Sequence, residues 1–500
     1  MARVHRLFLG GQWRQGSTGE FRSVINPANE QEVARVACAT SADLDEALAS
    51  AVQSAREWSD VPPEERGSLL VRGAERLQSR IDAASALLSE EQGKTVAEAR
   101  EEFARAVDTI VWNGQQASAL CAPVAASSAR WQLPEPGGVV AAFTPWNYPA
   151  VVTARKLAPA LAAGCPVILK AAEEAPSAAV AIVSALEEAG LPPGVLSLVF
   201  GDPPKISSHL LASPAVRVVT FTGSTRVGRE LATAAAPRLQ RCLLELGGHA
   251  PVIILDDANV DAAVQAIATY KFKSAGQSCN TASRLLVQRG VYETVVQRLT
   301  AVAKAIRVGP GNDPETQMGP VATPRGLATL ERLTADAVAR GAIVTAGGSR
   351  LKRSGYFWPP TILRDVPPDA AIMHDEPFGP ILPIVPFGAV AEAVSIANSS
   401  RYGLAAYVFT RSQGMATRIV GALSVGSVGV NQLKGVAPDL AVGGLNDSGY
   451  GYEGGVEGFR AFQSLKVISA KEEQDVSLRQ GASRSGDAPG EEEFPENRAL

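Results

Sequence analysis

A cysteine and a glutamate stand in two short motifs whose residue types could carry chemistry. Cys279 follows a Gly-Gln-Ser turn at the end of residues 272–279, and Glu245 opens the stretch Glu-Leu-Gly-Gly at residues 245–248. A thiolate can bind a carbonyl carbon covalently, and a carboxylate can act as the base of a following step. Either motif alone is also compatible with a structural role, because an unpaired cysteine often packs as a small inert hydrophobe.

Composition sets the broad class of protein. The chain has 500 residues, of which 46% are hydrophobic and 20% are charged, so it can bury large cores and is expected to form several domains. Its 47 Lys and Arg residues nearly balance 51 Asp and Glu residues, for a net charge of -4. This balance gives no indication of a nucleic-acid partner or of an anionic membrane surface.

Cysteine and histidine usage gives no sign of a disulfide framework or a metal site. The cysteines are odd in number and show no CxxC spacing, which favours a reducing cytoplasm. The histidines are isolated, so neither a zinc site nor a Ser-His-Asp triad is expected, and we expect no bound metal. Residues 1–12 lack a long apolar run, and no apolar stretch is long enough to span a membrane. The residues concerned are Cys38, Cys121, Cys165, Cys242, Cys279, His5, His209, His249 and His374.

Periodicity predicts an α/β protein. Residues 41–105 have a helical, Ala-rich pattern that Pro62-Pro63 interrupts once. Short apolar runs then alternate with helix-like segments, as expected for buried parallel strands joined by helices. The runs are 139–143, 167–169, 195–200, 218–221 and 243–246, with helices expected over 150–164 and 177–190.

A second α/β series follows Gly247-Gly248. Strands are expected at 252–255, 285–287 and 343–345, and a helix at 291–308. A Gly-Gly pair between two domains would place Glu245 on one side of a cleft and Cys279 on the other. Residues 472–500 are polar and rich in Ser, Gly and Glu, so we expect a disordered tail there.

Five further motifs accompany Cys279 and Glu245. They are Thr-Pro-Trp-Asn-Tyr-Pro at 144–149, Lys-Ala-Ala-Glu at 170–173, Phe-Thr-Gly-Ser at 221–224, Glu-Pro-Phe-Gly-Pro at 376–380, and Gly-Gly at 443–444. In this order the seven motifs resemble the NAD(P)-dependent aldehyde dehydrogenase superfamily, over residues 8–467. The resemblance implies the aldehyde dehydrogenase fold, with a Rossmann-like cofactor domain, an α/β catalytic domain and a small β oligomerisation element.

The resemblance assigns a catalytic role to three residues. Cys279 is expected to attack the aldehyde and form a thiohemiacetal. Asn147 is expected to stabilise the resulting oxyanion together with the backbone N–H of Cys279. Glu245 is expected to activate the water that hydrolyses the thioester, with a pKa raised by burial at the domain joint.

Cofactor binding is implied for residues of the same motifs. No GxGxxG follows the first strand of the parallel series; instead Gly223 and Ser224 end a strand and open a helix whose first N–H groups could face a pyrophosphate. Lys170 and Glu173 are expected to bind the adenosine ribose, and an acidic group there favours NAD over NADP. The remaining implied cofactor residues are Thr144, Trp146, Leu246, Glu376 and Phe378.

The substrate class depends on two cations. Arg155 lies two helical turns after Asn147 and should point into the access channel, and Lys273 occupies the place of a second arginine in succinate-semialdehyde dehydrogenases. Together they favour a semialdehyde of a carboxylic acid, and the closing stretch 448–455 resembles the bacterial branch of such enzymes. A serine that those enzymes use is absent, because Val436 and Ala437 stand there. A larger apolar or aromatic aldehyde therefore stays open.

The predicted domain layout follows the same resemblance. Residues 1–117 and 137–247 form the NAD-binding domain, 248–447 the catalytic domain, and 118–136 and 459–471 the strands that join a homodimer or homotetramer. Two other functions stay open. A CoA-acylating enzyme would pass the acyl group to a thiol, which Glu245 argues against, and a non-catalytic structural relative would not need the intact Cys279, Glu245 and Asn147.

Overall fold

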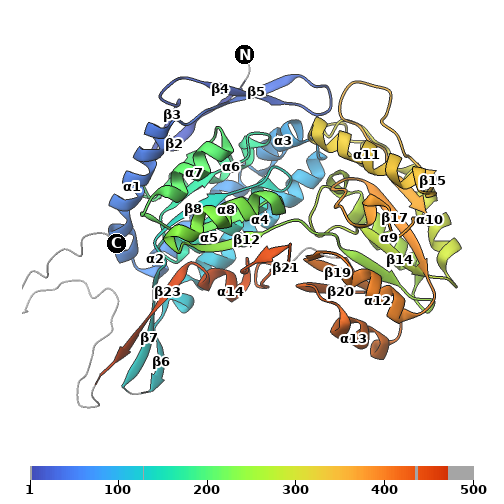
Figure 1. Cartoon of the computed structure of the whole chain (residues 1–500). Coiled ribbons are helices and arrows are strands. Elements are labelled where there is room, and N and C mark those ends of the chain that lie inside the picture. The colour runs from blue at the N-terminus through green and yellow to red at the C-terminus, as the bar shows by residue number, and fades with distance from the viewer. Residues whose placement is uncertain (1–2, 128, 434–436, 471–500) are drawn as a thin grey trace, which may run out of the picture.

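The computed structural model describes residues 3–127, 129–433 and 437–470. Two large sheets with helices on their faces make up the body of the molecule (Figure 1). The predicted disordered tail at 472–500 lies outside the described residues. No helix within the described ranges is long and apolar enough to cross a membrane.

The first sheet has eight strands in the order β22-β12-β11-β8-β9-β10-β2-β3. Its five central strands run parallel and are almost wholly buried, as their apolar sequences require, while β2, β3 and β22 pair antiparallel at the edges. The strands are β2 (Leu7–Leu9), β3 (Gln12–Arg14), β8 (Val139–Phe143), β9 (Val167–Lys170), β10 (Leu196–Val199), β11 (Val216–Thr222), β12 (Arg241–Glu245) and β22 (Gly449–Tyr450).

Helices surround this sheet. Helix α4 (Val96–Cys121) packs on α2 (Pro63–Gln78), α3 (Ile81–Gln92) and α5 (Pro149–Ala162), and α5 lies directly on β8 and β9. The break predicted at Pro62-Pro63 is confirmed, since α1 ends at Asp60 and α2 begins at Pro63. The single interruption expected over 41–105 is wrong, because the chain also leaves the helix at 79–80 and 93–95. The other helices on this sheet are α1 (Ser41–Asp60), α6 (Pro176–Glu188), α7 (Pro203–Ala212), α8 (Thr225–Ala235) and the short α14 (Gly455–Arg460).

The second sheet has seven strands in the order β15-β16-β17-β14-β13-β19-β20, all parallel except the edge strand β15. Its own apolar core is separate from that of the first sheet. Its elements are β13 (Pro251–Ile254), α9 (Val260–Lys271), β14 (Arg284–Gln288), α10 (Tyr292–Ala305), α11 (Pro324–Ala339), β15 (Ile343–Ala346), β16 (Thr361–Arg364), β17 (Ile381–Phe387), α12 (Val390–Asn398), β19 (Ala405–Phe409), α13 (Gln413–Ala422) and β20 (Ser427–Val430).

The chain passes from the first sheet to the second at the predicted Gly-Gly joint. β12 ends at Glu245 and β13 begins at Pro251. A Cβ atom on Gly248 would lie 2.1 Å from the backbone oxygen of Cys279. Only a residue without a side chain allows these two backbones to approach so closely, so this glycine brings the joint against the cysteine loop.

Three smaller sheets complete the fold. β6 (Val124–Ser127), β7 (Arg130–Pro136) and β23 (Gln463–Ser469) form an arm that projects from the body (Figure 1). The other two join β1 (Arg3–His5), β5 (Glu32–Ala37) and β4 (Phe21–Ile25), and β18 (Tyr402–Gly403) with β21 (Leu445–Asn446).

Two strand segments predicted at the arm begin too early. Residues 118–121 belong to α4, which buries Ala117 and Cys121 and stops just before Pro123, a residue that cannot continue the helix. Residues 459–460 likewise belong to the end of α14, and the side chain of Phe459 in this helix is fully buried. Tertiary burial of these apolar residues extends both helices into the range expected to be strand.

Candidate active site

Five of the predicted site residues line one pocket of about 370 Å³, here called the central pocket. It lies where elements of the two large sheets meet, and it contains the predicted nucleophile, base and oxyanion donor. Both cations predicted to bind an acid group line it as well. The five residues are Asn147, Arg155, Glu245, Lys273 and Cys279.

The loop before Cys279 has a strained backbone that is tied at several points. Ser274 and Ala275 both have φ near +50°, a region that side chains disfavour, and Gly276 has φ +71°. Ser274 N donates to Glu98 Oε1 at 2.8 Å. The Gln277 side chain donates to Ser274 O at 3.0 Å and accepts from Ala322 N at 2.9 Å. These bonds explain the Gly-Gln pair, since the glycine permits the turn and the glutamine fixes it.

Cys279 is half-buried and is the one described cysteine that lines the central pocket. Burial raises the pKa of its thiol to about 12, and the charges of Glu376 and Glu245 add to this effect. Arg155 acts in the opposite direction. The resting thiol is therefore protonated at neutral pH, and its attack on a carbonyl requires a base that takes the proton.

Asn147 is buried and its side chain binds the cysteine loop directly. Its Nδ2 donates to Gln277 O at 3.0 Å, so one of its two amide hydrogens is occupied and the other is available. Lys94 Nζ donates to the Asn147 backbone oxygen at 2.8 Å. Lys94 is also paired with Glu102, whose Oε1 accepts from Ala150 N at 2.8 Å at the start of α5. This buried pair holds the segment that carries Asn147.

Glu245 ends β12 with a buried carboxyl whose Oε1 has no hydrogen-bond partner. Burial raises its pKa well above the ordinary value, and the charge of Glu453 raises it further, while Lys156 and Arg155 act against both. Glu453 and Lys156 form a buried ion pair, in which Lys156 also donates to Thr220 at 2.9 Å. A carboxyl with a raised pKa and a free oxygen can exchange protons near neutral pH.

Residues predicted to hold a pyrophosphate lie at the start of α8. Ser224 caps this helix by accepting from Val227 N, and it borders a second pocket of about 480 Å³ with Arg226 and Arg229. Gly223 N donates to Glu245 O at 3.0 Å. Leu246 lies against Gly228 of α8, where a Cβ would come within 2.4 Å of its side chain. Helix N–H groups and arginines at one pocket suit a phosphate-bearing ligand.

Lys170 and Glu173, both predicted to bind the adenosine ribose, form an ion pair of 2.7 Å, and Glu173 Oε1 also accepts from Gly201 N at 2.9 Å. The carboxylate is thus fixed at the end of β9. Two other predicted residues, Trp146 and Phe378, meet edge to face with ring centroids 5.6 Å apart.

Two predicted cofactor residues carry buried oxygens without a partner. These atoms are Thr144 Oγ1 and Glu376 Oε1. Burial raises the pKa of Glu376 to about 8 and lowers the pKa of nearby Lys271 to about 7. Buried polar groups are normally paired, so these unpartnered oxygens fit a site completed by a bound polar molecule. The described residues include no group of three or more His, Cys, Asp or Glu that could hold a metal ion.

The two predicted substrate cations differ in their surroundings. Arg155 lies close enough to Cys279 and Glu245 to lower the pKa of both. Lys273 is paired with Glu101 of α4, so part of its charge is neutralised within the protein. Val436, where a serine was noted as absent, lies outside the described residues.

Sequence reasoning missed three charged residues of the central pocket. In the sequence, Glu453 stands among glycines, and Arg105 and Glu101 resemble ordinary charges of a long helix. Their spacing of four residues on α4 was the available signal, because it puts both on one helix face. Nothing in the sequence said that this face borders a pocket.

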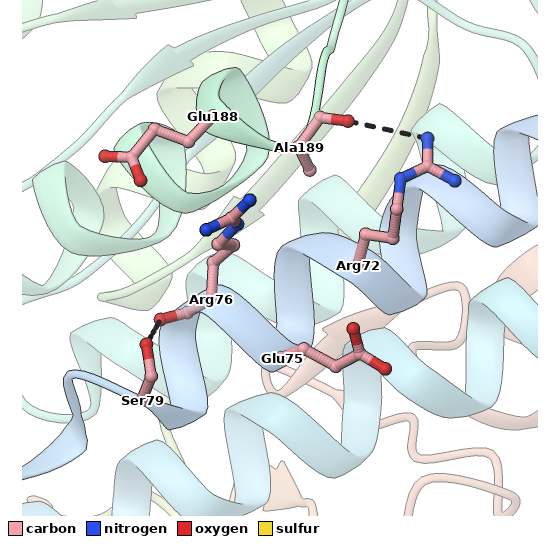
Figure 2. Close-up of a pocket in the computed structure, with 6 residues that line it drawn as sticks. All are labelled: Arg72, Glu75, Arg76, Ser79, Glu188 and Ala189. Atoms are coloured by element: carbon pink, nitrogen blue, oxygen red, sulfur yellow. Dashed lines mark hydrogen bonds between the residues drawn. The ribbon is translucent and has the colours of Figure 1, made fainter.

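A third pocket lies on the surface between α2 and α6 (Figure 2). It is lined by Arg72, Glu75, Arg76, Ser79, Glu188 and Ala189. Two of its side chains are engaged within the protein, since Arg72 donates to Ala189 O and Glu188 pairs with Arg80. It has no cysteine, and its carboxylates Glu75 and Glu188 are exposed, so the central pocket is the candidate active site.

Comparison with known proteins agrees with this geometry. The model of the family described as "Aldehyde dehydrogenase family" matches residues 13–468. The chain belongs to the aldehyde dehydrogenase family. Members use a nicotinamide cofactor, so this aldehyde dehydrogenase is an oxidoreductase that acts on aldehydes.

Several relatives of this aldehyde dehydrogenase are named for compounds that contain an acid group. It is 44% identical to the 4-(hydroxymethyl)benzenesulfonate dehydrogenase TsaD1 of Comamonas testosteroni, over 93% of this chain and 98% of the relative. It is 36% identical to an NADP-dependent succinate-semialdehyde dehydrogenase of Escherichia coli, over 93% and 97%. The solved succinate-semialdehyde dehydrogenase of Burkholderia pseudomallei matches with a TM-score of 0.91 and 35% identity, over 93% and 98%.

Replacement of Glu453 by Gln should move the acidic limb of the kcat/KM–pH profile to lower pH, by about one unit. The change removes one negative charge near Glu245 and leaves the Lys156 cation, and both effects lower the pKa of Glu245. The base is then ionised at lower pH. Profiles of kcat/KM between pH 5 and 10 test this.

Glu457→Gln, an exposed change on α14, is the matched control. Thermal unfolding of both variants should accompany the profiles, because Glu453→Gln breaks a buried ion pair. An unchanged limb, or a limb moved to higher pH, contradicts the assignment of Glu245 as the base.

Proposed function

We propose that this aldehyde dehydrogenase oxidises an aldehyde bearing an acid group to the carboxylic acid, with NAD as the preferred cofactor. The observation that carries the proposal is the meeting of Cys279, Glu245, Asn147 and Arg155 in one pocket. Carboxylate and sulfonate groups both suit an arginine, which offers paired N–H donors with a permanent charge.

The first step is attack of Cys279 Sγ on the aldehyde carbon. The thiol proton passes to a base, for which the carboxylate of Glu245 is available in the same pocket. The free N–H of Asn147 Nδ2 and the backbone N–H of Cys279 stabilise the negative oxygen of the thiohemiacetal. When bound, a nicotinamide supplies the acceptor for the hydride.

The second step is hydrolysis of the thioester on Cys279. Glu245 takes a proton from water, and the hydroxide adds to the acyl carbon, so that the carboxylic acid leaves and the thiol is restored. The raised pKa of Glu245 suits this transfer near neutral pH. The same carboxyl argues against a CoA-acylating enzyme, where water must be excluded from the acyl group.

The residues present fit a nicotinamide dinucleotide. We propose that Ser224 and the N-terminus of α8 bind the pyrophosphate, with Gly223 and Leu246 shaping that turn. Lys170 and Glu173 bind the adenosine ribose, and Glu376, Phe378, Trp146 and Thr144 bind the nicotinamide half. The unpartnered oxygens of Glu376 and Thr144 support this assignment.

The domain roles follow from these assignments. We propose that the eight-stranded sheet binds the cofactor and that the seven-stranded sheet, with residues 248–447, carries the nucleophile. The arm formed by β6, β7 and β23 is proposed to join two or four copies of the chain. Val124, Leu465 and Val467 on the arm are 51%, 62% and 69% exposed, which supports a covered surface there.

A larger aromatic aldehyde is the second candidate substrate. Part of the pocket wall is apolar, formed by Val151, Val152, Leu404, Leu433 and Val442. Two relatives are named for 4-(hydroxymethyl)benzenesulfonate, a compound that combines an aromatic ring with an acid group. The two candidates therefore merge in an aromatic aldehyde that carries a carboxylate or sulfonate.

Wild-type enzyme should oxidise acid-bearing aldehydes with a higher kcat/KM than benzaldehyde, and Arg155→Ala should remove the difference. Loss of a buried charge partner costs about 2–5 kcal/mol, or roughly 30-fold and more in kcat/KM. Succinic and glutaric semialdehydes, 4-formylbenzoate and benzaldehyde form the panel. Lys273→Met is the comparison, with a smaller effect expected because Lys273 is already paired with Glu101.

Two outcomes of this panel contradict the proposal. If wild type oxidises no aldehyde with either nicotinamide cofactor, the proposed activity is wrong. If Arg155→Ala leaves the preference for acid-bearing aldehydes unchanged, Arg155 does not bind the acid group.

Glu173→Gln should raise the ratio of kcat/KM with NADP to kcat/KM with NAD by about tenfold, because it removes the carboxylate that repels a 2′-phosphate. Glutamine keeps an oxygen that can accept from Gly201 N. The adjacent, exposed Glu174→Gln is the control. An unchanged ratio, or strong wild-type preference for NADP, refutes the proposed role of Glu173.

A further inference from the structure

Arg105 on α4 lines the central pocket, and part of its guanidinium has no hydrogen-bond partner. Its Nε and Nη2 atoms are buried and make no hydrogen bond. The group lies over the Tyr148 ring, with 5.6 Å between the guanidinium carbon and the ring centroid. An arginine offers five N–H donors, and burial without acceptors is costly, so a ligand oxygen would stabilise this site.

Other buried arginines of the chain are satisfied by backbone oxygens. Arg284 donates to the oxygens of His249, Ile396 and Ala397. Arg66 likewise donates to several backbone oxygens, Ala162 O among them. The unbonded nitrogens of Arg105 contrast with these two arginines, and they occur at a pocket wall.

Arg105 and Arg155 lie at different places in the pocket. The charge of Arg155 acts on Cys279 and Glu245, at the reacting end. The charge of Arg105 acts on Tyr148, Tyr270 and Glu101. Arg105 is not among the charges that shift the pKa of Cys279 or Glu245, and its guanidinium packs over the ring of Tyr148.

We propose that Arg105 is a specificity-determining residue that binds the acid group of aldehydes in which this group lies farther from the aldehyde carbon than the reach of Arg155. This inference rests on the proposed function and refines its substrate class. Aldehydes with a rigid spacer, such as an aromatic ring between the carbonyl and a carboxylate or sulfonate, fit such an outer site. The apolar residues Val151, Val152 and Leu433 would contact the spacer.

The test compares kcat/KM of wild type, Arg105→Gln and Arg105→Lys on four aldehydes. These are succinic semialdehyde, 4-formylbenzoate, 4-formylbenzenesulfonate and benzaldehyde. Arg105→Gln should lower kcat/KM for the two aromatic acids about 30-fold or more, and leave benzaldehyde and succinic semialdehyde within about threefold. Arg105→Lys should fall between, because it keeps the charge and loses the paired donors.

Arg100→Gln is the matched control, since Arg100 is an exposed residue of the same helix that pairs with Asp82. Its kcat/KM values should equal those of wild type. Thermal unfolding of each variant separates a folding defect from a change in preference.

Three results overturn the inference. Arg105→Gln could stay folded and lower kcat/KM equally for all four aldehydes, which would show a structural role. It could keep the wild-type preference for the aromatic acids, which would show that Arg105 does not bind their acid group. It could lower kcat/KM most for succinic semialdehyde, which would place Arg105 at the reacting end. If wild type oxidises none of the four aldehydes, the proposed function itself is wrong. That outcome differs from the three above, in which the enzyme is active but the role of Arg105 is wrong.

Discussion

The hydrogen bond from Asn147 Nδ2 to Gln277 O joins the two halves of the site. Asn147 belongs to the segment that begins α5 on the first sheet, and Gln277 belongs to the loop that carries Cys279 after α9 of the second. The loop adopts backbone angles that side chains disfavour, so it needs such fixed points to keep its shape. Gly248 completes the junction by allowing its backbone to pass against the Cys279 oxygen.

Charge is distributed unequally along the central pocket. It holds two carboxyls, Glu245 and Glu453: burial raises the pKa of Glu245, and Glu453 forms a buried ion pair with Lys156. Its walls carry the cations Arg155, Arg105 and Lys273, and Lys273 forms an ion pair with Glu101. The pocket therefore combines a carboxyl of raised pKa with three cations.

Short motifs predicted residues that the structure brings together in the central pocket, because each motif has a local backbone requirement. The Gly-Gln turn before Cys279 and the Gly-Gly pair after Glu245 are visible in sequence, and both occur where backbones approach closely. The buried parallel strands could also be predicted, because they appear in the sequence as apolar runs. The helix ends at the arm were harder to predict, because burial of Cys121 and Phe459 extends α4 and α14.

Site residues that no recognisable motif contains could not be predicted from the sequence. Lys94, Arg105 and Glu453 look like surface charges in sequence, and only the packing of α4 and the return of the chain after β22 bring them to the site. The same holds for Arg155 and Lys273, the two cations predicted to bind an acid group. The sequence showed both cations, but the pairing of Lys273 with Glu101 depends on where α4 packs.

Capture of the acyl group on Cys279 in the Glu245→Gln variant tests the central claim most directly. The variant is mixed with NAD and excess benzaldehyde, quenched, digested and examined by mass spectrometry. We predict NADH formation that stops at one equivalent per site and is slower than in wild type, because Glu245 no longer takes the thiol proton. We also predict an acyl group on the peptide that contains Cys279, because the thioester is not hydrolysed. Unchanged steady turnover without an acyl adduct, or an adduct on another cysteine that Cys279→Ala does not abolish, would contradict the account.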